Sequence, residues 1–113
     1  MDLSLTTREE SGFTVVAPAG EVDVFTAPKL DEALAPLTSQ QQPRIIVDFT
    51  GVDFLDSSGL GVLVKALKRV RDHDGTLRLV VTSDRIAKVF RVTGLDAVIP
   101  LYDTLPDALA ATD

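Results

Sequence analysis

The sequence contains no cysteine and only one histidine among its 113 residues. Without cysteine, the chain can form no disulfide, no thiolate metal site and no thiol nucleophile. Basic residues are also scarce: 11 Lys and Arg against 17 Asp and Glu give a net charge of −6, which argues against a nucleic-acid-binding face. No apolar run approaches the roughly 20 residues of a membrane span, and the first residues do not resemble a signal peptide. We therefore expect a soluble cytoplasmic protein with no direct nucleic-acid or membrane partner.

What the chain does contain is the composition of one folded domain. Apolar residues make up 45% and charged residues 25%, as in ordinary globular proteins. A length of 113 residues is enough for one hydrophobic core. We find no internal repeat, low-complexity stretch or linker, and we predict a single domain over residues 1–113.

The apolar patterns predict an α/β fold in the order β-β-α-β-α-β-α-β-α, with a mixed, mostly parallel sheet of five strands and four helices. The strands are expected at residues 3–8, 13–19, 44–49, 77–82 and 97–101. The helices are expected to start at Thr26, near Ser58, at Ser83 or Asp84, and after Thr104. The first two strands form a hairpin, and crossover helices make the later strands parallel. Residues 20–25 and the segment between Phe49 and Ser58 are expected to be loops.

A proline within the apolar stripe of the first helix gives a local prediction. Pro36 lacks the N–H for an intrahelical hydrogen bond, and its ring clashes with the preceding turn. We expect this helix to end or kink within one turn of Ala35.

The parallel sheet also predicts where a site would lie. The carboxyl ends of parallel strands meet at one edge of the sheet, and binding sites gather there. This edge is expected to bring together residues 20–23, 53–58 and 82–83, with the N-termini of three helices.

Three candidate helix caps stand in a row at residues 56–58. A helix start leaves backbone N–H groups without partners, and the short oxygen-bearing side chains of Asp56, Ser57 and Ser58 could all accept from them. Two of these caps would be surplus if capping were their only role. Capping and a further role for one serine both remain open from the residues alone, with Ser58 better placed as the structural cap.

The segment Asp56-Ser57-Ser58-Gly59-Leu60-Gly61 resembles the phosphorylation loop of bacterial anti-sigma factor antagonists, single-domain proteins of the STAS class. The likeness continues through residues 20–23 (Gly-Glu-Val-Asp) and 90–95 (Phe-Arg-Val-Thr-Gly-Leu), so it covers nearly the whole chain. It implies that Ser57, the serine directly after the aspartate, is phosphorylated. The implied partner-binding residues are Asp23, Asp56, Ser57, Ser58, Gly59 and Gly61.

Each of these residues also has an interpretation without a partner. Asp56 could simply stabilise a helix N-terminus, and Asp23 could be a solvated loop residue. Glycine in a first helical turn costs roughly 1 kcal/mol relative to alanine. Gly59 and Gly61 therefore indicate a close approach, either of a partner backbone or of the helix to its own sheet, and the sequence does not separate the two.

The resemblance implies a partner switch. The unmodified form binds an anti-sigma factor and so frees the sigma factor. That anti-sigma factor is also the serine kinase, which binds ATP and Mg²⁺, and a PP2C-like phosphatase reverses the modification. No cofactor or metal is expected in this chain itself.

An enzyme is the competing interpretation. A nucleophilic Ser57 would need a base, but the sole histidine, His73, is predicted at the opposite end of the same helix. The glycines match neither a P-loop nor a dinucleotide-binding fingerprint. We therefore expect a protein that is not an enzyme; the alternative function is a STAS scaffold or nucleotide-binding module in a larger signalling assembly.

Overall fold

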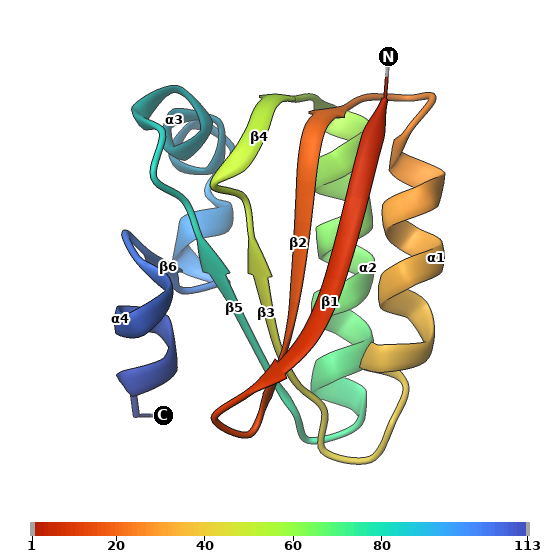
Figure 1. Cartoon of the computed structure of the whole chain (residues 1–113), viewed down its shortest axis with the longest axis vertical. Helices are drawn as coiled ribbons and strands as arrows, with labels where there is room; N and C mark the ends of the chain where they lie inside the picture. The colour runs from red at the N-terminus through yellow and green to blue at the C-terminus, as the bar shows by residue number, and fades with distance from the viewer. Residues whose placement is uncertain (1, 113) are drawn as a thin grey trace.

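A computed structural model describes residues 2–112 and shows an α/β domain (Figure 1). The strands are β1 (Leu3–Glu10), β2 (Phe13–Val22), β3 (Arg44–Asp48), β4 (Gly51–Leu55), β5 (Thr76–Val80) and β6 (Leu101–Tyr102). The helices are α1 (Ala27–Thr38), α2 (Ser57–Asp72), α3 (Asp84–Thr93) and α4 (Leu105–Ala110), with a short 3₁₀ helix, η1 (Leu95–Ala97).

The sheet has the predicted mixture of strand directions. Its main order is β1-β2-β3-β5-β6; β1 and β2 pair antiparallel, and every other pair is parallel. The hairpin turns at Ser11 and Gly12, both with positive φ (50° and 84°). The α/β class, the hairpin and the parallel crossovers are thus confirmed.

The number of strands is corrected from five to six, because β4 lies where a loop was expected. Residues 20–22, also expected as loop, continue β2 and pair with β4. β3 pairs with the first part of β2, through residues 14–16, and β4 with its last part, through residues 19–22. One long strand is therefore flanked on the same side by two short ones.

The last strand is shorter than predicted. Residues 95–97 form η1, and only Leu101 and Tyr102 pair with β5. Pro100 stands directly before this strand and has no N–H to contribute to the sheet. In α1, Pro36 lies inside the helix, which ends at Thr38. This end is three residues beyond Ala35, so the predicted end within one turn is confirmed.

Helices cover both faces of the sheet and enclose two groups of core side chains. α1 and α2 lie side by side on one face, above the larger group, which includes Val16, Leu34, Val47, Leu63 and Leu79 (Figure 1). α4 covers a smaller group on the other face, which includes Phe13, Val15, Ile46, Val80 and Ala108. Within the part of the chain that the structure describes, no helix is long and apolar enough to cross a membrane.

Arg78 is a buried charge under α4 that the sequence did not reveal. Its side chain is 2% exposed, its guanidinium lies 4.7 Å from the centre of the Phe13 ring, and its Nη1 donates to the Ala108 carbonyl at 2.8 Å. A buried cation is tolerated when it is hydrogen-bonded and stacked in this way. Arg78 therefore helps to hold α4 on the sheet.

Candidate functional site

The candidate site lies where β2 and β4 end and α2 begins. The two strand ends are joined by a backbone hydrogen bond, from the Asp56 N–H to the Val22 carbonyl at 3.2 Å. β2 leads into the loop before α1, and β4 leads directly into α2 (Figure 1). The predicted meeting of residues 20–23 with residues 53–58 is confirmed by this pairing.

Asp56 is the cap of α2. Its Oδ1 accepts from the N–H groups of Ser58 at 2.9 Å and Gly59 at 3.4 Å, and the helix begins at Ser57. The prediction that Ser58 is the structural cap is wrong, because Ser58 lies inside the first turn and its own N–H is the group being capped. Neither serine hydroxyl is therefore needed to cap α2.

The two serines differ in exposure. Ser57 is exposed, whereas Ser58 is half-buried. As the first helical residue, Ser57 is at the end of α2 that carries the positive partial charge of the helix dipole. The more exposed serine is thus the one for which the family resemblance implies phosphorylation.

The two glycines of α2 have different surroundings. A Cβ added at Gly59 would lie 2.6 Å from Cγ1 of Val22 and against the Leu55 side chain, too close for either contact. A Cβ at Gly61 would meet nothing within 4 Å, and Gly61 is exposed. Gly59 therefore allows the helix to pack on its own sheet, whereas Gly61 leaves bare backbone open to solvent.

Asp23 organises the loop between β2 and α1. Its Oδ1 accepts from the N–H groups of Phe25 at 2.9 Å and Thr26 at 3.0 Å. The Thr26 hydroxyl accepts from the Asp23 N–H at 2.9 Å and donates to the Glu21 carbonyl at 2.7 Å. Thr26 stands directly before α1, where the helix was expected to start, but its hydroxyl makes no cap hydrogen bond to α1 and braces this loop instead.

Asp23 is only 8% exposed, so much of its carboxylate serves the loop. Burial by itself would raise the pKa of this carboxyl group, but the N–H donors of Thr26 and Phe25 stabilise the ionised form. The net effect holds the pKa of Asp23 below its ordinary value of 3.8. The ionised carboxylate of Asp23 therefore has a structural role in this loop, separate from any contact with a partner.

Exposed apolar side chains surround this edge, and the sequence analysis missed them. Phe25 is 86% exposed, Val24 61% and Phe54 47%. Val24 and Phe25 lie in a short loop and Phe54 in a strand interrupted by a bulge, so none of them belongs to a regular apolar pattern, and their exposure could be found only from the tertiary structure. The only sequence signal was their place beside the residues already selected.

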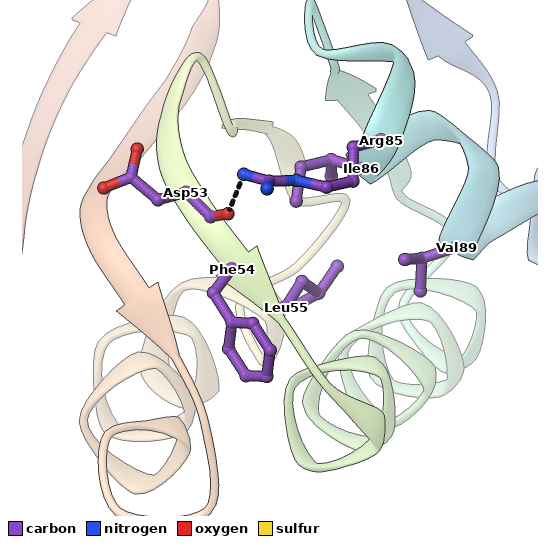
Figure 2. Close-up of a pocket in the computed structure, with 6 residues that line it drawn as sticks. All are labelled: Asp53, Phe54, Leu55, Arg85, Ile86 and Val89. Atoms are coloured by element: carbon purple, nitrogen blue, oxygen red, sulfur yellow. Dashed lines mark hydrogen bonds between the residues drawn. The ribbon is translucent and has the colours of Figure 1, made fainter.

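A hollow of about 320 Å³ lies between β4 and α3. Figure 2 shows Leu55, Ile86 and Val89 in its wall, while the Phe54 ring points away from Arg85. Arg85 Nη2 donates to the Asp53 carbonyl at 2.8 Å and so ties α3 to β4. Ser83, predicted to lie at this edge, caps α3 by accepting from the Ile86 N–H at 3.4 Å.

The sole histidine lies at the opposite end of α2 from Ser57. His73 ends α2, a 16-residue helix of roughly 24 Å that begins at Ser57. Its Nδ1 is 2.7 Å from the Arg69 carbonyl. Among residues 2–112, no group of three or more His, Asp or Glu side chains is arranged to hold a metal ion.

Comparison with known proteins decides the family. A family model described as the STAS domain matches residues 4–108. The chain belongs to the STAS family. A relative of this STAS chain in Staphylococcus aureus (strain NCTC 8325 / PS 47), named anti-sigma-B factor antagonist, is 38% identical over 95 residues, which are 84% of this chain and 88% of the relative. A protein of the same name in Staphylococcus epidermidis is 36% identical over the same shares.

Solved structures agree with this assignment. An anti-sigma factor antagonist from Mycobacterium paratuberculosis superposes on the STAS chain with a TM-score of 0.88 and 31% identity, over 96% of this chain and 92% of that one. SpoIIAA of Bacillus in its phosphorylated form gives a TM-score of 0.72 at 22% identity, over 94% and 96%. The likeness to SpoIIAA shows the shared fold.

Proposed function

We propose that this STAS chain is an anti-sigma factor antagonist whose binding is switched off by phosphorylation of Ser57. The observation that carries the proposal is the position of Ser57, an exposed serine at the first residue of α2. Relatives that match this chain over most of its length are named anti-sigma-B factor antagonists. The site therefore fits regulated binding to an anti-sigma factor.

The position of Ser57 explains how one phosphate could stop binding without unfolding the domain. A phosphate adds a charge of about −1.5 to −2, which a helix N-terminus tolerates. A partner surface lying over the same loop would have to accommodate added bulk and a desolvated dianion. It would also meet Asp56 and the exposed Asp53 beside that dianion. The fold can tolerate the modification, and the complex cannot.

In this proposal the chain is ligand and substrate, and is not an enzyme. The unmodified form binds the anti-sigma factor, which releases its sigma factor. The anti-sigma factor phosphorylates Ser57 using ATP and Mg²⁺ bound in its own site, and a PP2C-like phosphatase removes the phosphate. The separation of Ser57 from the sole histidine by the length of α2 supports a passive role for the serine.

The first experiment identifies the partner with Ser57→Ala protein, which cannot be phosphorylated at this residue and is expected to retain the anti-sigma factor. The purified anti-sigma factor is then incubated with wild-type protein and ATP. We expect one phosphate per chain on Ser57 and none when the anti-sigma factor is left out. Phosphate on the chain alone with ATP, or phosphorylation only at another residue, contradicts the proposal.

A further inference from the structure

We infer that Phe25, supported by Val24, is an apolar anchor that inserts into a socket on the anti-sigma factor. The inference rests on the proposed function and names a contact that neither the motif nor the family assignment supplies. The five phenylalanines differ widely in their exposure. Three of the five are buried, with at most 2% exposed, and Phe54 is about half exposed, whereas Phe25 is 86% exposed.

The loop that carries Phe25 is held in place. Its N–H donates to Asp23 Oδ1 at 2.9 Å, and the following N–H, of Thr26, donates to the same oxygen at 3.0 Å. The Ala27 N–H donates to the Asp23 carbonyl at 2.8 Å, so the loop is fixed to the first turn of α1. An aromatic side chain presented on a braced backbone loses little conformational entropy on binding, which is a property of interface anchors.

The loop that carries Phe25 is also linked to the end of α2 that carries Ser57. Phe25 lies three residues after Val22, whose carbonyl accepts from the N–H of Asp56, the residue before Ser57. Phe54, 47% exposed, pairs with Glu21 on the same edge. A surface that covers Ser57 at this edge would therefore reach the end of the loop that carries Phe25.

Charge decides between an anti-sigma factor and a second copy of this chain. Asp53 and Asp56 both lie just before Ser57, in a chain with a net charge of −6. A symmetric dimer through Phe25 would bring these carboxylates toward their own copies, and like charges across an interface oppose association. The fitting occupant is a different protein, with an apolar socket next to a neutral or basic rim.

The test is calorimetric titration of the purified anti-sigma factor, identified with Ser57→Ala, into four forms of the protein: wild type, Phe25→Ala, Phe25→Leu and Val92→Ala. Val92 is the matched control, because it is an apolar side chain on α3 that is 75% exposed. We expect Phe25→Ala to weaken binding about 30-fold or more, as truncation of an anchor does. Phe25→Leu should recover part of the loss, and Val92→Ala should stay within about threefold of wild type. Binding should also show a less negative heat-capacity change with Phe25→Ala, because less apolar surface is buried.

Thermal melting of each variant shows that the fold is intact, as expected for exposed positions. If wild type binds and Phe25→Ala binds within about threefold of it, the anchor is refuted while the proposed function stands. If wild type binds no anti-sigma factor, the proposed function and this inference both fail. If the wild-type chain self-associates in size-exclusion chromatography and the Phe25→Ala chain does not, the occupant is a second copy and the inference is wrong.

Discussion

Substituting Gly59 and Gly61 separately by alanine should change stability in opposite directions. Both glycines lie in the first turns of α2, and alanine is intrinsically favoured there by about 0.5–1 kcal/mol. The difference comes from the space around each Cβ. At Gly61 a Cβ meets nothing within 4 Å, so Gly61→Ala should gain that amount in full.

At Gly59 the new Cβ would collide with Val22 and Leu55. The Leu55 methyl is the end of a flexible side chain and can move, but the β-branched Val22 has a stiff χ1 and sits on a paired strand. Overpacking of this kind costs about 1–3 kcal/mol. After the helix gain is subtracted, Gly59→Ala should destabilise the domain by up to about 2.5 kcal/mol.

Urea unfolding of the two variants and wild type measures both effects. A change of 1 kcal/mol shifts the melting temperature of a domain of this size by roughly 4 °C, so thermal melting provides a second readout. We expect Gly61→Ala to lie above wild type and Gly59→Ala below it. Equal shifts of the same sign would show that the packing of α2 on β2 and β4 is not as tight as the structure indicates.

Three further predictions follow from the same edge. Asp56→Ala should destabilise the domain by about 0.5–2 kcal/mol because it removes the cap of α2, whereas Ser58→Ala should change stability by less than about 0.5 kcal/mol. If urea unfolding shows that Ser58→Ala costs more than Asp56→Ala, Ser58 is the cap and the assignment to Asp56 is wrong. Phosphorylation of Ser57 should leave the melting temperature almost unchanged, since the charge is added at an exposed helix N-terminus, and a large drop would mean that the switch works by unfolding. Because the pKa of Asp23 is lowered, its ionised form stabilises the fold above pH 3.8, and this contribution is lost as the pH falls below that value. Asp23→Asn should therefore make the melting temperature depend less on pH in the acid range. An unchanged dependence would contradict the role of the Asp23 carboxylate in holding the loop.

The fold class was accessible from the sequence because its strands and helices carry continuous apolar patterns. β4 was not, for a specific physical reason. The pairing of β2 with β4 slips between Gly20 and Glu21, which face Val52 and Phe54, so that Asp53 is an extra residue in β4. The two buried residues of this strand, Val52 and Leu55, are therefore three positions apart, and the two-residue alternation of a strand is lost.

The candidate site was also only partly predictable from the sequence. The row of candidate caps pointed to the start of α2, but which of them caps depends on side-chain geometry, and that geometry selects Asp56. The glycines signalled a close approach, but only their neighbours show that Gly59 faces the sheet and Gly61 faces solvent. On α2, Val64 fits the apolar spacing yet is 48% exposed, because the inward face is completed by Ala66 and Val62.

The central claim is that a negative charge at Ser57 prevents binding to the anti-sigma factor. The most direct measurement is calorimetric titration of the anti-sigma factor into Ser57→Ala, Ser57→Glu and Ser58→Glu. Ser57→Ala loses at most one hydrogen bond, about 0.5–1.5 kcal/mol, and should still bind. Ser57→Glu places an unpaired charge in the interface, at a cost of about 2–5 kcal/mol, and should weaken binding by tens- to thousands-fold. If Ser57→Glu binds as tightly as wild type while Ser58→Glu does not, the switch lies on the other serine and the account is contradicted.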